Sequence, residues 1–86
     1  MNILKIAIIA KDKVAYDGEA ISVVVPTKSG IIEVLPEHMQ LVSALAKGEI
    51  VLTLANEKKT FSISGGVLEI KPKSNVIILA DIVSDK

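Results

Sequence analysis

The stretch Phe61–Asp81, which reads Phe-Ser-Ile-Ser-Gly-Gly-Val-Leu-Glu-Ile-Lys-Pro-Lys-Ser-Asn-Val-Ile-Ile-Leu-Ala-Asp, decides the fold of this chain. Apolar and polar residues alternate through Phe61–Ile63 and again through Leu68–Ile70, and this period of two is typical of half-buried strands. The pair Gly65-Gly66 separates the first two runs, and Pro72–Asn75 separates the second from the third. The stretch therefore predicts three short strands joined by two tight turns.

The same pattern continues through the rest of the chain. Turn signals at Asp17-Gly18, Lys28–Gly30, Lys47-Gly48 and Asn56-Glu57 lie between apolar runs rich in β-branched residues. No helical period stands out, although Pro36–Gln40 suits one tight turn. The runs span residues 2–10, 13–16, 20–26, 31–35, 40–46 and 49–55. We predict an all-β fold, a small β-sandwich or jelly-roll-like domain of about 8–10 short strands.

One domain accounts for the length of 86 residues. The sheet is expected to end near Ala80, so that residues 1–81 form the sandwich domain. Residues 82–86 are then a short polar C-terminal tail that frays.

Composition excludes several classes of function. The residues are 50% hydrophobic, but Tyr16 and Phe61 are the only aromatic residues, so the core must be aliphatic. The formal charge is zero and the chain has no Arg, which argues against a nucleic-acid partner. Without Cys there is no disulfide or thiolate chemistry. No apolar run reaches the ~20 residues that span a bilayer, and Ile6–Ala10 is too short for a signal peptide, so membrane association must come through a partner.

Several strands carry apolar residues where the alternation predicts an outward-facing side chain. For each residue alone, coverage by a neighbouring loop is an alternative. A contiguous group of such residues indicates a protein interface, and we expect a partner surface here. The residues are Val24, Val42, Val51, Val67, Ile77 and Leu79.

The chain lacks the residue patterns that most enzymes need. It has no nucleophile elbow and no phosphate-binding loop, and Gly65-Gly66 precedes a strand, so we interpret this pair as positions that need φ > 0 or close packing. Glu37 beside His38 does not make a three-ligand metal cluster. His38 itself hydrogen-bonds within its loop or packs at the surface, or it donates to a partner chain. We predict no catalytic residues, no cofactor and no metal.

A second marker precedes the first, Gly30-Ile-Ile-Glu-Val-Leu-Pro-Glu-His-Met-Gln-Leu41. With the opening strand 3–9, the Tyr16–Ala20 turn and the Ser64–Ile70 and Asn75–Asp81 segments, the ordered set resembles the sandwich domain of the epsilon subunit of rotary F-type ATP synthases. The resemblance covers nearly the whole chain and implies a non-catalytic central-stalk (rotor) subunit. Such a subunit packs on the gamma subunit and on the c-ring, couples rotation to ATP synthesis, and binds no nucleotide in this domain. It lies at the cytoplasmic face of the plasma or energy-transducing membrane, peripheral to it and not inserted in the bilayer.

The resemblance also implies candidate partner-interface residues. By position, the loop that begins at Thr27 matches the family's ring-facing loop, and the turn that begins at Pro36 matches the one that approaches gamma. Val42 joins the interface as an outer apolar residue. The candidates are Thr27, Lys28, Ser29, Gly30, Ile31, Pro36, His38, Met39 and Val42.

The chain departs from the family at three points. Ile31 stands where many relatives carry an acidic residue, so we expect a hydrophobic contact there. Glu33 stands where glycine is usual, and because a positive φ is costly for a residue with a Cβ, we predict a negative φ. Family members commonly continue into a C-terminal helical hairpin that can inhibit hydrolysis or bind ATP; the chain stops at Lys86, so we expect neither property.

Three other functions remain as alternatives. A stand-alone β-sandwich binding module for a peptide or sugar fits the fold, although sugar binding favours exposed aromatic residues. A biotin- or lipoate-carrier domain requires a modified lysine at a hairpin tip, and Lys58-Lys59 is the available candidate. A small enzyme is the third, and it lacks the residues named above.

Overall fold

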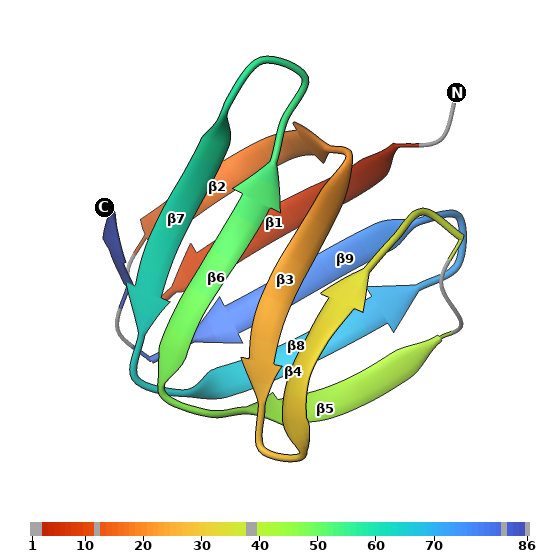
Figure 1. Ribbon diagram of the computed structural model, residues 1–86. Helices are drawn as coiled ribbons and strands as arrows, with labels where there is room; N and C mark the ends of the chain where they lie inside the picture. Colours follow the sequence, from red (N-terminus) through yellow and green to blue (C-terminus); the bar gives the residue numbers. More distant parts are fainter. Residues whose placement is uncertain (1–2, 12, 38–39, 82, 86) are drawn as a thin grey trace.

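The computed structural model describes residues 3–11, 13–37, 40–81 and 83–85, and these form ten β-strands without a helix (Figure 1). The predicted all-β sandwich of short strands is therefore confirmed. The strands are β1 (Leu4–Ala10), β2 (Lys13–Ala20), β3 (Ser22–Thr27), β4 (Gly30–Val34), β5 (Leu41–Leu45), β6 (Gly48–Thr53), β7 (Lys58–Ile63), β8 (Gly66–Lys71), β9 (Asn75–Ala80) and β10 (Val83–Asp85).

The strands form two layers that face each other. One layer has the order β5-β8-β9-β1-β2, and the other has the order β4-β3-β6-β7-β10. We call them the β9 layer and the β6 layer. Hydrogen bonding continues from one to the other where Thr27 of β3 pairs with Leu45 of β5. Figure 1 shows the strands of the two layers crossing at a steep angle. Among the described strands, β1 and β9 make the one parallel pair.

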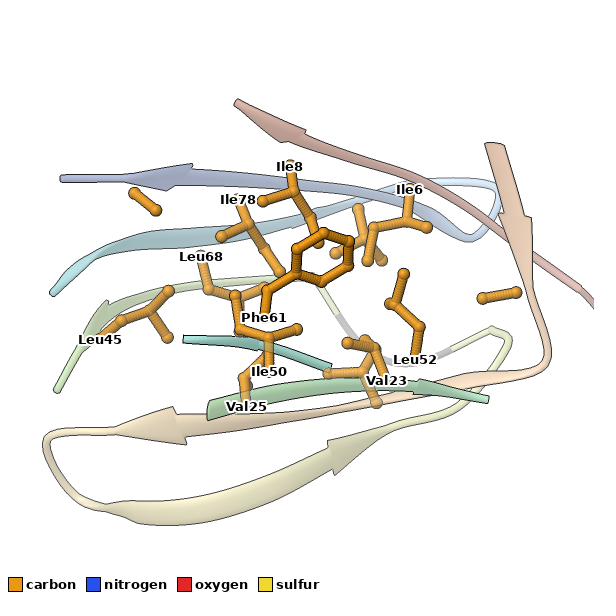
Figure 2. Close-up of a cluster of buried hydrophobic side chains, with 14 of the residues drawn as sticks. Ile6, Ile8, Val23, Val25, Leu45, Ile50, Leu52, Phe61, Leu68 and Ile78 are labelled. Atoms are coloured by element: carbon orange, nitrogen blue, oxygen red, sulfur yellow. The ribbon is translucent and has the colours of Figure 1, made fainter. Parts of the chain in front are cut away.

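The core lies between the layers and is almost entirely aliphatic, as the composition predicts. Alternate residues of each strand point inward, so β1 contributes Ile6 and Ile8 and β8 contributes Leu68 (Figure 2). Phe61 is the one buried aromatic residue of the described chain, and its ring meets the Tyr16 ring edge-on with centroids 6.2 Å apart. Because close-packed interiors have low compressibility, this core makes the domain a stiff block.

The predicted turn at Asp17-Gly18 is wrong. β2 runs through it, with Asp17 opposite Ala7 and Gly18 opposite Ile6. Glycine is used there because the Tyr16 side chain folds back over it. A Cβ on Gly18 would lie 3.1 Å from the Tyr16 hydroxyl, which donates a hydrogen bond of 2.9 Å to the Glu19 carbonyl.

The predicted end of the sheet near Ala80 is also wrong. Val83–Asp85 forms β10 and pairs antiparallel with β7, so part of the expected polar tail belongs to the β6 layer. The reason is that one edge of β7 would otherwise present unpaired N–H and C=O groups. Polar composition alone does not reveal this pairing.

Two backbone predictions are confirmed. Glu33 lies in β4 opposite Val24 and is not among the described residues with positive φ. Gly66 has φ of 151°, and a Cβ there would overlap the Leu79 carbonyl oxygen, so this position needs glycine on both grounds. Gly65 has φ of 154°. The expected turn at Pro36–Gln40 is seen at Pro36 and Glu37.

Candidate partner-binding surface

A row of apolar side chains crosses all five strands of the β9 layer on its outer face. The pairing registers place Val67 of β8 between Ala44 and Leu79, and Leu79 beside Ile9. The row ends at Val14 of β2, opposite Ile9. We call this row the apolar stripe: Ala44, Val67, Leu79, Ile9 and Val14.

The neighbouring rows define the borders of the stripe. On one side lies a mixed row, in the order Val42, Glu69, Ile77, Ala7 and Asp17. Val42 is 67% exposed, so it extends the apolar surface toward the start of β5. The next row is polar, with Lys71, Asn75, Lys5 and Glu19 in register. An apolar centre with a polar rim is the usual anatomy of a protein–protein interface.

The outer face of the β6 layer is different. Its central row holds Val24 and Val51, both half-buried, between Glu33 and Thr60. The flanking positions hold Ser22, Thr53 and Lys58 on one side and Glu49 and Ser62 on the other, where exposed Ile31 lies opposite Pro26 near the β3–β4 hairpin. The six predicted outer apolar residues therefore divide between the faces, four on the β9 layer and two on the β6 layer.

The candidate residues from Thr27 to Ile31 form the β3–β4 hairpin. Thr27 is buried, and its hydroxyl donates a hydrogen bond of 2.5 Å to the Gly30 carbonyl and accepts one of 3.2 Å from the Ser29 amide. Ile31 is 76% exposed. The Lys28 amide donates to the Ala44 carbonyl at 3.0 Å, which fixes the hairpin beside the end of the apolar stripe.

Among the remaining candidates, Pro36 lies near the other end of β4. Pro36 follows β4, and the next residue, Glu37, donates its amide hydrogen to the Ser74 hydroxyl over 2.8 Å. His38 and Met39 lie outside the described residues. Val42 comes shortly afterwards on β5. The β3–β4 hairpin and Pro36 therefore lie at opposite ends of β4 (Figure 1).

Sequence reasoning missed four apolar residues of the surface, Ala7, Ile9, Val14 and Ala44. Ala7 and Ile9 lie in the run Ile6–Ala10, where alternation is hidden because every residue is apolar. The missing information is the parallel register of β1 with β9, which brings Ile9 beside Leu79. Val14 was missed because a single apolar residue near polar neighbours is weak evidence for an interface position.

Among the described residues, no three or more His, Asp or Glu side chains gather in a way that could hold a metal ion. Within the same residues, no helix has the length and apolar character that crossing a membrane requires.

Residues 3–85 match the sequence family described as "ATP synthase, Delta/Epsilon chain, beta-sandwich domain". This chain belongs to that family. It is 36% identical over 84 residues to the ATP synthase epsilon chain of Neisseria meningitidis serogroup C (strain 053442), and the match covers 95% of this chain and 59% of that protein. It is 38% identical over 80 residues to the ATP synthase epsilon chain of Leptospira interrogans serovar Lai, with 93% and 62% covered. The chain therefore spans about three-fifths of these relatives.

Solved structures share the fold of this delta/epsilon-family chain at low sequence identity. A chain of the Euglena gracilis mitochondrial ATP synthase, in a structure of OSCP/F1/c-ring, superposes with a TM-score of 0.90 at 20% identity; 95% of this chain and 52% of that chain are covered. A chain of the Tetrahymena thermophila mitochondrial ATP synthase, in a structure of the central stalk and c-ring, gives 0.81 at 12% identity, with 95% and 66% covered. The predicted resemblance to the epsilon sandwich domain is confirmed.

Proposed function

We propose that this chain is a non-catalytic central-stalk subunit of an ATP synthase, and that the apolar stripe is the surface on which the gamma subunit packs. The observation that carries the proposal is the stripe itself. Five strands of one layer place apolar side chains in one outward row, in a chain whose relatives are ATP synthase epsilon chains. Folding does not require this row, because both inner faces already supply a closed core.

The role proposed for the domain is mechanical. A rotor subunit couples rotation driven by the membrane sector to ATP synthesis only if it transmits torque without deforming. Aliphatic residues packed between two crossed layers resist deformation. The stripe lies on continuous strands rather than on loops, so its side chains keep fixed positions relative to the core.

We assign the c-ring contact to the β3–β4 hairpin. Ile31 is the most exposed of the large hydrophobic residues in the described chain, and a rigid turn supports it because Thr27 bridges Ser29 and Gly30. We expect an apolar contact of Ile31 with the ring. The chain is then held peripherally at the cytoplasmic face of the membrane through its partners, and it takes no part in binding the reacting nucleotide.

The experiment that tests this function is co-purification with the gamma subunit of the same organism. We expect an equimolar complex from the wild-type chain. Val67→Asp places a charge at the centre of the stripe and should weaken the complex about 30-fold or more, since central interface residues cost about 2 kcal/mol or more when altered.

The matched control is Thr60→Asp on the outer face of the β6 layer. This variant should bind gamma like the wild type, because it introduces the same charge on the opposite face. Equal weakening by both variants would contradict the assignment of the stripe. A folded wild-type chain that does not bind gamma would favour a stand-alone β-sandwich binding module instead.

A further inference from the structure

Ser74 joins three segments that are far apart in the sequence. It lies in the β8–β9 turn, and its carbonyl accepts a hydrogen bond of 2.9 Å from the Lys5 amide at the start of β1. Its hydroxyl accepts one of 2.8 Å from the Glu37 amide in the β4–β5 connection. Lys5 continues the parallel pairing of β1 with β9, so the carbonyl contact belongs to the β9 layer. The hydroxyl contact instead holds a connection that comes from the β6 layer.

The backbone at this junction is unusual. Glu37, Lys73 and Ser74 have φ of 66°, 64° and 60°, and they are the described residues other than glycine with positive φ. A residue with a Cβ adopts this left-handed conformation only when its surroundings impose it. All three meet where the Glu37 amide reaches the Ser74 hydroxyl. Such clustered outliers are a reason to ask for a function.

The junction lies beside the candidate surface. Gln40, the last residue of the β4–β5 connection, and Val42 of β5 line a shallow depression of about 510 Å³ together with Lys71 of β8 and Pro72 of the β8–β9 turn. Any shift of the connection relative to the turn therefore changes the shape of this end of the surface, where Val42 is exposed.

We propose that Ser74 is a positioning residue for partner binding: its hydroxyl fixes the β4–β5 connection against the β8–β9 turn and so sets the shape of the surface around Val42. This inference rests on the proposed function, because it assumes that gamma contacts the outer face of the β9 layer. Ser74 itself acts through the Glu37 backbone and not by touching the partner.

If Ser74 served only folding, removing its hydroxyl would mainly lower the stability of the domain. The positioning role predicts a different result. The Glu37 hydrogen bond is exposed, so water can replace the hydroxyl when it is removed, and the stability of the sandwich should change little. What is lost is the fixed position of the connection. Removing the hydroxyl should therefore weaken gamma binding and accelerate amide exchange at Glu37 without lowering the melting temperature.

The test uses two substitutions that both suit a left-handed backbone. Ser74→Gly removes the hydroxyl and leaves no acceptor, whereas Ser74→Asn supplies an amide oxygen and tolerates positive φ. The readouts are amide hydrogen exchange at Glu37, exchange at Leu68 in the core, and affinity for gamma. We expect Ser74→Gly to accelerate Glu37 exchange and to weaken gamma binding, each about 2- to 10-fold. Leu68 exchange should not become faster, because glycine also relieves the strain of the positive φ at this position. Ser74→Asn should recover part of both losses.

The outcomes separate the two proposals. Unchanged Glu37 exchange in Ser74→Gly would overturn the positioning role. Faster Glu37 exchange with unchanged gamma affinity would show that the Ser74 hydroxyl holds the connection but does not contribute to partner binding. If the wild-type chain does not bind gamma, the proposed function fails, and Glu37 exchange still decides whether the Ser74 hydroxyl holds the connection.

Discussion

The two outer faces of the sandwich differ although the two inner faces are alike. Both layers turn aliphatic side chains inward, such as Ile78 from the β9 layer and Ile50 from the β6 layer. Outward, the β9 layer shows the apolar stripe across all five strands, whereas the β6 layer shows hydroxyl, Lys and Glu side chains around two half-buried valines, with one exposed apolar residue, Ile31, at its β3–β4 hairpin. The inner rows already form the core, so we infer that the extra apolar row on one outer face is covered by a partner, as proposed above.

The exposed fractions of individual side chains follow this comparison with one exception. Val42, Val67 and Leu79 are 67%, 42% and 50% exposed, and all three lie on the outer face of the β9 layer. Ile31, which is 76% exposed, lies on the β6 layer at the β3–β4 hairpin. Apolar residues that are exposed singly are common on protein surfaces, but here adjacent strands hold them in register. Substitutions that disturb the strand pairing or the core should therefore reduce stability more than substitutions in the hairpin and turn residues.

The largest effect is expected at Gly66 of β8, where an added Cβ would point into the backbone of β9. Gly66→Ala puts a Cβ into the Leu79 carbonyl oxygen and 2.9 Å from the Ala80 Cα, at φ of 151°. Overpacking and backbone strain together should cost about 3–5 kcal/mol of unfolding free energy. Urea unfolding followed by circular dichroism measures the loss.

Gly30→Ala is the control for this prediction. Gly30 has φ of 130°, but a Cβ added there would meet no atom within 4 Å, so only the backbone cost of about 1–2 kcal/mol applies. Equal losses at the two glycines would show that the clash of an added Cβ with the β9 backbone does not matter.

The next largest effect is expected from the inner face of β8, and it is compared with a substitution on the outer face of the same strand. Leu68 is fully buried and Val67, its neighbour, is an exposed member of the stripe. Leu68→Ala should cost about 3 kcal/mol, because it leaves a cavity in the core. Val67→Ala should cost less than about 1 kcal/mol. A comparable cost for both in thermal unfolding would mean that Val67 serves folding and that the stripe needs no partner.

A smaller effect is expected where the two layers join. The Thr27 hydroxyl bridges Ser29 and Gly30 beside the Thr27–Leu45 pair. Thr27→Val keeps the side-chain shape and removes both hydrogen bonds, so stability should fall by about 1 kcal/mol. Faster amide exchange at Ser29 should accompany the loss. Unchanged exchange would refute the account of a rigid hairpin.

The smallest effect is expected at Lys73. Lys73→Gly relieves the strain of φ at 64° and should raise stability by about 0.5–1 kcal/mol, because the relief exceeds the backbone entropy that glycine adds. Lys71→Gly in β8 is the matched control, and there glycine should destabilise. Calorimetry of the two variants gives the comparison, and a fall in melting temperature for both would contradict it.

The sequence was sufficient to predict the parts of the fold that depend on local pattern. Alternation identified the inner row, and Gly65-Gly66 signalled the constrained backbone beside Leu79. It failed where a local signal competed with tertiary contacts: Asp17-Gly18 looks like a turn, yet Tyr16 packs over Gly18 within β2.

The candidate surface depended on information that alternation does not carry. Ile9 and Leu79 are adjacent only because β1 and β9 pair in parallel across most of the chain length. Likewise β10 is a strand because β7 offers an edge, not because residues 83–85 have strong strand character. The assignment of Thr27, Ile31 and Pro36 to particular partners stays a prediction.

The most direct test of the central claim is a methyl-labelled NMR titration of this chain with the gamma subunit. Val and Leu methyl groups occur in the molecule on both layers, and the valines of the two outer faces are internal controls for each other. The account predicts shift changes or broadening at Val67, Leu79 and Val42, with Val24 and Val51 unaffected. Changes confined to Val24 and Val51 would place the partner on the β6 layer and contradict the account.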